Sequence, residues 1–378
     1  MRRLAIALVL LILTVPIAAW GATVKPDGSG DYTNIQEALD ALEDGDAILL
    51  TEGIFTGPGN WDLDPGGKHF HFYGLPADPE LVVIDLEDPS GRSAHRAIIL
   101  DTSGEEGTRF ENITFRGGRA PGAAGGVAIL MVPWVDFINC IFEDNQADLG
   151  GVFHIQGATI YSKDCHYHLN FADQGGVAYL EESAFFGDLG YFNLFTNNHA
   201  NSRGGVFACS ESASGSLGLR GGSVFWQNSA TLTGGVAYTN GTVWAYLEHV
   251  TAVENFAPIG SAFHLNYAFD LEHSIIAWGN SAPVQGTGVT SGAMCNNIFG
   301  NTGGDWLGPI TGYLGTDGNI SEDPEFCGLS DGYFALQSDS PCAPDHSSCP
   351  GELIGALPVE CGEQTTTVMQ WDALKTLY

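Results

Sequence analysis

The sequence predicts an all-β protein, a single-stranded right-handed parallel β-helix with a short capping helix at its N-terminal end. Three observations predict this fold: a composition suited to short strands, Gly-Gly pairs that recur every 25 to 30 residues, and asparagines that recur with the same period. The 378 residues are 44% hydrophobic and only 15% charged, and 51 are glycine. Such a chain favours many short strands and tight turns over long surface helices.

The Gly-Gly and Asn columns share one register along the chain. The Gly pairs begin at Gly125, Gly150, Gly175, Gly204 and Gly234, with a degenerate Gly260-Ser261 pair after them. The asparagines are Asn145, Asn170, Asn198, Asn228, Asn255 and Asn280. Coils of this length cannot bury their own apolar face, so they stack, and equivalent residues then form ladders. We expect the amides to bond from coil to coil and the glycines to form sharp corners.

A third column lies three residues before the asparagines and is mostly aromatic. Its members are Phe142, Tyr167, Phe195 and Phe225, followed by Ala252 and Ala277. We interpret the aromatic and Asn columns as a structural ladder inside the helix rather than as a binding site. Cys140 and Cys165 fall one coil apart, two residues before this column, and we expect buried thiols there, with a bridge along the axis as the alternative.

The N-terminal end predicts export followed by a cap. Residues 1–22 have the basic, apolar and small-residue regions of a signal peptide, with no transmembrane span left in the mature chain. Within 23–50, Thr33 or Asn34 caps a short helix, and the first strand follows. The run from Lys25 to Leu50 resembles the opening of pectin-lyase-like β-helix proteins. The resemblance implies that the helix closes the open end of coils spanning 51–326.

The C-terminal end predicts a Cys-rich closing segment at 327–362 and a tail at 363–378. Asp323-Pro-Glu-Phe and Ile354-Gly-Ala resemble the last coil of secreted bacterial β-helix proteins. We expect two disulfides among the four cysteines of this region, because a small irregular segment gains most from covalent links; metal binding is the alternative. These cysteines are Cys327, Cys342, Cys349 and Cys361. We interpret the tail as a short helix that packs on the body or as a frayed terminus, with a secretion or surface-sorting signal as the alternative.

Two further resemblances concern function. The Gly-Gly-Val/Ala and Phe-x-x-Asn repeats between about 115 and 280 resemble those of chlamydial-type polymorphic outer-membrane proteins, which implies a surface-displayed passenger involved in adhesion. Val135-Asp-Phe-Ile resembles the catalytic segment of pectin methylesterases, but the Gly-Asn that should follow is missing, and so is a matching Arg-containing motif. We therefore do not carry that activity over, and no catalytic residue is assigned.

Charge restricts the partners. The net charge of −32 becomes −34 when Arg2 and Arg3 leave with the signal peptide, which excludes nucleic acid as a partner.

Asp148 and Asp173 each lie three residues past a ladder Asn, so we expect them about 5 Å apart on adjacent turns. They are candidate ligands for Ca²⁺, the one cofactor that the sequence suggests; two solvated turn aspartates are the alternative.

A column after the Gly pairs is the candidate carbohydrate-binding surface. It contains His154, Tyr179, Tyr238 and His264, and we expect its neighbours to be core, which leaves this strip exposed; the alternative is that the column points inward and is itself core.

From these features we expect a monomeric, secreted or cell-surface β-helix protein that serves in adhesion or as a structural or surface-display module without catalysis. The expected partner is an extracellular polysaccharide or a component of a host or cell surface. The alternatives are an extracellular carbohydrate-binding protein and a polysaccharide lyase or hydrolase of pectin-lyase-like fold. An aromatic surface strip favours carbohydrate binding, whereas a lyase or hydrolase requires an acid, a base and a cation on one face.

Overall fold

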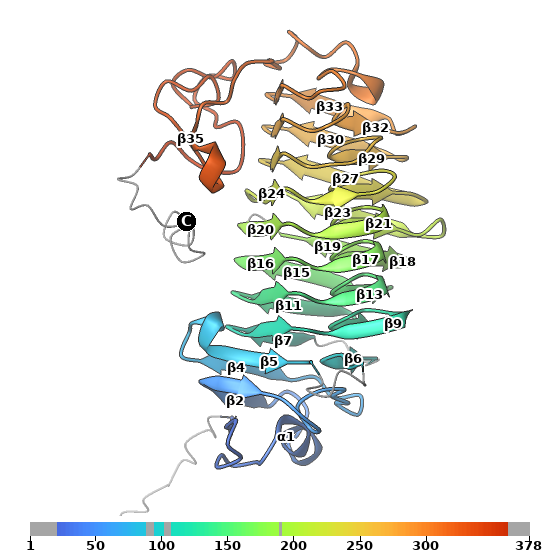
Figure 1. Cartoon of the computed structure of the whole chain (residues 1–378), viewed down its shortest axis with the longest axis vertical. Helices are drawn as coiled ribbons and strands as arrows, with labels where there is room; N and C mark the ends of the chain where they lie inside the picture. Colours follow the sequence, from blue (N-terminus) through green and yellow to red (C-terminus); the bar gives the residue numbers. More distant parts are fainter. Residues whose placement is uncertain (1–20, 88–93, 102–106, 189–190, 362–378) are drawn as a thin grey trace, which may run out of the picture.

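The described chain forms an all-β parallel solenoid of about nine turns with one α-helix (Figure 1). The computed structural model describes residues 21–87, 94–101, 107–188 and 191–361. Nearly all of the expected signal peptide and the whole tail at 363–378 lie outside them. No helix in these described ranges is long and apolar enough to cross a membrane. The predicted parallel β-helix is therefore confirmed.

Each regular coil contributes strands to four parallel sheets, in the order A, B, D and C. Sheet A contains β1 (Ala22–Val24), β2 (Ala47–Thr51), β4 (His71–Leu75), β7 (Thr108–Glu111), β11 (Trp134–Ile138), β15 (Thr159–Lys163), β19 (Ser183–Gly187), β23 (Ser214–Leu219), β27 (Thr242–Glu248), β30 (Phe269–Glu272) and β33 (Thr290–Met294). Sheet B contains β3 (Gly53–Phe55), β5 (Val82–Asp85), β8 (Thr114–Arg116), β12 (Ile141–Glu143), β16 (Cys165–His168), β20 (Asn193–Thr196), β24 (Val224–Trp226), β28 (Thr251–Val253), β31 (Ile275–Ala277) and β34 (Asn297–Phe299).

The other two sheets complete each coil. Sheet C contains β6 (Ile98–Leu100), β10 (Ala128–Leu130), β14 (Phe153–Gln156), β18 (Ala178–Glu181), β22 (Phe207–Cys209), β26 (Ala237–Thr239), β29 (Phe263–Leu265) and β32 (Val284–Gln285). Sheet D contains β9 (Arg119–Ala124), β13 (Gln146–Leu149), β17 (Phe171–Gln174), β21 (His199–Arg203) and β25 (Ser229–Ala230). Short 3₁₀ helices η1 (Pro79–Leu81) and η2 (Gly308–Ile310) lie between strands.

The predicted aromatic column is a continuous stack in the core. Phe142, Tyr167, Phe195 and Phe225 are fully buried and face one another across successive coils, with ring centroids 4.6 to 4.9 Å apart. Cys140 and Cys165 lie beside the stack as buried free thiols, as expected, and burial raises the pKa of the Cys140 thiol well above its ordinary value.

The Asn ladder runs next to the aromatic stack at the turn between sheets B and D. Each side-chain amide donates to the Oδ1 of the next Asn at 2.9 to 3.1 Å, from Asn145 through Asn170, Asn198 and Asn228 to Asn255. Each Oδ1 from Asn170 to Asn255 also accepts from the backbone N–H of the previous ladder residue. The amides thus satisfy backbone groups that the buried turn would leave unpaired.

The left-handed backbone conformation belongs to the residue before each ladder Asn and not to the Asn itself. The residue before each ladder Asn has positive φ, as in Asp144 (φ 51°) and Leu169 (φ 54°). At the Gly pairs, Gly150 has φ 64°, while a Cβ on Gly151 would lie 2.2 Å from the carbonyl oxygen of Gly176. The first glycine therefore provides the corner, and the second lets successive coils approach closely.

Asn280 is not a ladder residue, so the predicted columns are wrong in the last regular coil. The register pairs Ala252 with Ile276 rather than with Ala277, which places Gly279 in the ladder position. Gly279 follows Trp278, which has φ 56° like the other residues before the ladder. Asn280 accepts from the backbone of Ala257 instead. The step between these coils is 24 residues, one fewer than the spacing of the asparagines implied.

The N-terminal cap is helix α1 (Ile35–Ala41), which closes the lower end of the coil stack (Figure 1). Asn34 is its N-cap, because its side-chain oxygen accepts from the backbone N–H of Glu37 at 2.9 Å. The side chains of Ile35, Ala38 and Leu39 are buried in the main core.

The Cys-rich region is not the last coil but a segment that folds back along the side of the solenoid (Figure 1). It contains an antiparallel pair, β35 (Phe326–Gly328) and β36 (Tyr333–Leu336), joined by η3 (Leu329–Asp331). Its apolar residues pack on the outer face of sheet B, against Val224, Val253 and Ile275. The segment packs there because the outward-facing residues of sheet B become apolar in the upper coils and are stabilised when they are shielded from water.

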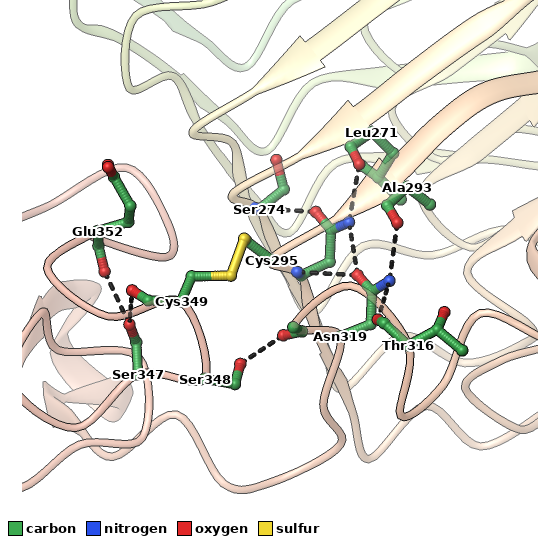
Figure 2. The surroundings of a disulfide bond; sticks show 12 residues. Leu271, Ser274, Ala293, Cys295, Thr316, Asn319, Ser347, Ser348, Cys349 and Glu352 are labelled. Carbon is green, nitrogen blue, oxygen red and sulfur yellow. Dashed lines mark hydrogen bonds between the residues drawn. A yellow bond between two sulfur atoms is a disulfide. The ribbon is translucent and has the colours of Figure 1, made fainter.

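One of the two disulfides joins this segment to the solenoid. Cys349 bonds Cys295, with a Cα–Cα distance of 5.8 Å, beside hydrogen bonds of a second Asn ladder that includes Asn319 (Figure 2). Cys327 bonds Cys361 within the segment, whereas Cys342 is a buried free thiol. The expectation of two bridges among the four tail cysteines is therefore wrong, because folding back brings Cys349 against a coil residue.

The Asn ladder can be tested at its centre. In Asn170→Ala the carbonyl of Phe142 and the amides of Asn145 lose their partners, so we expect the free energy of unfolding to fall by about 3 kcal/mol. Asn201→Ala, an exposed Asn with one side-chain bond to Asp173, is the control and should change it by less than about 1 kcal/mol. Urea unfolding followed by tryptophan fluorescence measures both, and equal losses would contradict the ladder's role.

The fold-back bridge can be tested by hydrogen exchange. Cys295→Ser/Cys349→Ser opens a loop of 54 residues, which we expect to cost about 4 kcal/mol, and the amides of β35 and β36 should lose protection. The ladder amides of Asn170 and Asn198 serve as the internal control and should keep their protection. Uniform loss across both groups would show that the segment is not a separate unit.

Candidate functional site

The strip predicted to bind carbohydrate lies outside the core but is largely shielded. Its neighbours Phe153, Ala178, Phe207, Ala237 and Phe263 are buried in the core, as expected. His154 is only 7% exposed, and Tyr179 and Tyr238 are 8% exposed. The expected exposure is wrong because neighbouring side chains cover the column: Glu181 lies 3.0 Å from His154 Nε2, and the Arg203 guanidinium stacks on Tyr238 at 4.8 Å. A role of these residues, and of the half-buried His264, in sugar binding stays a prediction.

Burial also sets the charge state of this column. It lowers the pKa of His154, although the Glu181 carboxylate acts in the opposite direction, and it lowers the pKa of His264. Neutral imidazoles are therefore favoured at neutral pH.

The two candidate calcium ligands lie on adjacent strands of sheet D, Asp148 on β13 and Asp173 on β17. Each accepts a hydrogen bond from a different coil: Asp148 from the backbone N–H of Gly122 at 3.0 Å, and Asp173 from Asn201 Nδ2 at 2.8 Å. Within the described ranges, no group of three or more His, Cys, Asp or Glu side chains is arranged to hold a metal ion. Calcium binding at this pair stays a prediction.

A pocket of about 390 Å³ lies on the outer face of sheet B, in the coils from β5 to β16. It is lined by Glu80, Val83, Thr114, Arg116, Ile141, Glu143, His166 and His168. Several of these side chains already have protein partners. Arg116 pairs with Asp85 at 2.8 Å, and both imidazoles lie within hydrogen-bonding distance of Thr196 Oγ1. Burial lowers the pKa of His168.

The outer face of sheet A carries a row of half-buried aromatic side chains, here called the aromatic strip. It consists of Trp134 on β11, Tyr161 on β15, Phe185 on β19, and Trp244 and Tyr246 on β27. They alternate with core residues such as Val135, Ile160, Phe186 and Ala245, so they point away from the core. Because β11, β15, β19, β23 and β27 are consecutive neighbours in sheet A, the strip follows the solenoid axis.

Glycines let two of these rings lie along the sheet surface. A Cβ on Gly107 would meet the Trp134 indole at 2.2 Å, so this ring covers the backbone of the neighbouring coil. A Cβ on Gly187 would lie 2.4 Å from the Phe185 ring, and a Cβ on Gly218 would lie 3.4 Å from it. Any larger residue at Gly107 or Gly187 would push the ring outward. The sequence therefore provides flat apolar platforms on two coils that are two steps apart.

Polar contacts hold the upper end of the strip. Trp244 and Tyr246 stack with centroids 5.3 Å apart and an interplanar angle of 3°. Trp244 Nε1 donates to Asp270 at 3.2 Å, and the Arg220 guanidinium lies 4.1 Å from the Tyr246 ring centre. These contacts restrict the rotamers of both rings, which lowers the entropy cost of binding a ligand on them.

At the lower end, Asp136 forms an ion pair with Arg109. The guanidinium of Arg109 on β7 donates to Asp136 Oδ2 on β11 at 2.9 Å through Nη2 and at 3.3 Å through Nε. The Asp136 carboxylate raises the pKa of Arg109. In register, Asp136 lies between Arg109 and Tyr161, so a charged pair and an aromatic ring share one surface.

Sequence reasoning missed the aromatic strip. Its members belong to no column of identical residues, because β23 carries Ser216 and Gly218 at the equivalent positions. A signal was present within single strands: in Thr242-Val-Trp-Ala-Tyr-Leu-Glu248, polar or aromatic residues alternate strictly with aliphatic ones. That alternation predicts one buried and one exposed face, with the aromatic side chains on the exposed face.

Fold and site together define a parallel β-helix protein with an aromatic and acidic outer surface along its axis. Aromatic platforms beside hydrogen-bonding carboxylates suit ligands that have both apolar faces and hydroxyl groups.

Comparison with curated proteins finds similarity to Pectinesterase 31 of Arabidopsis thaliana, 32% identical over 160 residues. The match covers 38% of this chain and 48% of the relative, so the chain spans about half the length of the curated relative it matches. No protein-family model matches, so the resemblance to polymorphic outer-membrane proteins gains no support. No solved structure shows a significant match.

Proposed function

We propose that this protein binds an extracellular polysaccharide along the aromatic strip of sheet A. The observation that carries the proposal is the row of rings, two of them lying over glycines, on an outer face of the solenoid that the fold-back segment does not cover. Pyranose rings present C–H groups on their faces and hydroxyls on their edges, which matches flat aromatic platforms flanked by carboxylates. The pectinesterase similarity supports a polysaccharide as the ligand class.

The spacing of the platforms supports an extended glycan. Trp134, Phe185 and Trp244 lie on β11, β19 and β27, which are every second strand of this part of sheet A. Strands in a sheet are about 4.8 Å apart, so successive platforms are separated by roughly 10 Å along the axis. An extended chain of pyranose rings that follows the axis would contact a platform repeatedly. Binding of this kind needs no catalysis and suits an adhesion or structural role.

Secretion is part of the same proposal. Two disulfides among the described cysteines suit an oxidising compartment, and the expected signal peptide would deliver the chain there. A polysaccharide ligand of the cell exterior would then be accessible.

Substitutions in the aromatic strip test the binding proposal. We expect Phe185→Ala and Trp244→Ala each to weaken binding about tenfold, because each removes one stacking platform. Affinity electrophoresis and calorimetry against a panel of soluble acidic and neutral polysaccharides give the measurement. Phe256→Ala, a 53% exposed phenylalanine away from sheet A, is the matched control. Retention of no polysaccharide by the unsubstituted protein would reject the proposal.

A second candidate function is hydrolysis of a polysaccharide ester. The observation that favours it is the position of Asp136, within the Asp-Phe-Ile segment, on the face that carries the aromatic strip and in an ion pair with Arg109. A carboxylate held in this way is suited to nucleophilic attack on an ester carbonyl. Under this candidate, Asp136 attacks the ester carbonyl, the bond to the methoxy oxygen breaks and, with a proton from water, methanol leaves; a water molecule then hydrolyses the acyl-enzyme, which releases the glycan carboxylate and regenerates Asp136.

Methanol release distinguishes the two candidates. If the esterase candidate is correct, the protein releases methanol from methyl-esterified pectin, and Asp136→Asn lowers the rate by about a hundredfold or more. Asp85→Asn is the matched control, because it changes an equivalent Asp–Arg pair on sheet B. Binding without methanol release would leave polysaccharide binding as the function.

A further inference from the structure

We infer that the polysaccharide bound on sheet A is an uncharged chain and that polyuronates are rejected. The inference rests on the proposed function and adds the chemical class of the ligand. It is carried by the distribution of charge around the aromatic strip rather than by the net charge of the chain alone.

Carboxylates outnumber cations on the outer face of sheet A. The outward positions of its strands carry Glu111, Asp136, Glu248, Asp270 and Glu272. Against these five carboxylates stand three cations on or beside the face, namely Arg109, Lys163 and Arg220. The local balance therefore has the same sign as that of the whole chain, which has 45 acidic and 13 basic residues.

Each of the three cations is already in contact with a protein group. Arg109 pairs with Asp136, Lys163 Nζ lies 4.2 Å from the centre of the Tyr191 ring, and the Arg220 guanidinium lies over Tyr246. A uronate carboxylate would have to displace or share these contacts. Recognition of a carboxylate usually relies on an arginine whose fork faces the ligand, and binding without one leaves a desolvated charge unpaired.

The strongest repulsion is expected at the upper end of the strip. Glu248 and Glu272 are directly paired on β27 and β30, and Asp270 is paired with Tyr246 in the same register. Glu248 lies two residues from Tyr246, on the same face of β27. A glycan carboxylate near Tyr246 would therefore approach three like charges within a few strand spacings, against one cation, the Arg220 guanidinium over that ring.

The same carboxylates are useful toward an uncharged glycan. Carboxylate oxygens accept hydrogen bonds from sugar hydroxyls, and such bonds to a charged acceptor are stronger than those between neutral groups. Between the two charged ends, the middle of the face is neutral, with Phe185, Ser216, Gly187 and Gly218. An uncharged chain would thus stack at the middle and bond through its hydroxyls at both ends.

Matched pairs of polymers test the inference. Galactan, glucomannan and a mixed-linkage β-glucan are each compared with a derivative whose C6 hydroxymethyl groups are oxidised to carboxylates. We expect at least one neutral polymer to bind about tenfold or more tighter than its oxidised counterpart at low salt, and the difference to shrink at about 0.5 M salt because screening weakens the repulsion.

Charge variants assign the effect to this face. Glu248→Gln/Glu272→Gln should strengthen binding of the oxidised polymer severalfold, because two repelling charges are removed, and should weaken binding of the neutral polymer, because an amide accepts weaker hydrogen bonds from sugar hydroxyls than a carboxylate does. Glu80→Gln/Glu143→Gln removes the same charge from the pocket on sheet B and should change neither.

The outcomes separate the two claims. If no polymer binds in either form, the proposed function fails. If an oxidised polymer binds as tightly as its neutral parent or more tightly, the inference fails while the proposed function stands. If selectivity against the oxidised form persists unchanged in Glu248→Gln/Glu272→Gln, the charge argument for this face is wrong.

Discussion

The register between successive coils determines every other feature of this molecule. Within the sheets, backbone hydrogen bonds between parallel strands fix this register. The buried turns between sheets B and D have no such strand pairing, and there the side-chain amides of the Asn ladder replace the missing backbone partners. A shift by one residue would exchange the core and solvent faces of a strand. The same constraint that stacks Phe142 on Tyr167 therefore also aligns Trp134, Phe185 and Trp244 on the outside.

The outer faces of sheets A, B and C are covered to different extents, and this difference identifies the candidate site. Sheet B becomes apolar on its outer face in the upper coils, and the fold-back segment covers it through Phe334 and Ile354 and the Cys295–Cys349 bond. On sheet C, the outward column is shielded by side chains such as Glu181 and Arg203. Sheet A keeps half-buried aromatic rings supported by glycines on its outer face, and for this reason we propose it as the binding surface.

Sequence reasoning predicted the fold because repeated residues with a structural role are identical from coil to coil. It failed at Asn280, where a coil one residue shorter moved an asparagine out of the ladder and left Gly279 in its place. It failed at Cys349, since no local pattern shows that the segment turns back to reach Cys295. The aromatic strip was missed for a related reason: outward-facing positions such as Tyr161, Phe185 and Ser216 are not restricted by the ladder, so they differ between coils and form no visible column.

The acidity of the chain and the proposed binding of a glycan are compatible once the two kinds of interaction are separated. Stacking of a sugar on Phe185 or Trp244 depends on apolar contact and dispersion, which the field of a net charge of −32 does not affect. A charged glycan would gain the same contacts and then lose part of that free energy to repulsion from Glu248 and Glu272. Under the proposed function, attraction on this face is therefore general for pyranose chains, whereas discrimination comes from the groups that repel, because specificity is a difference between two binding free energies.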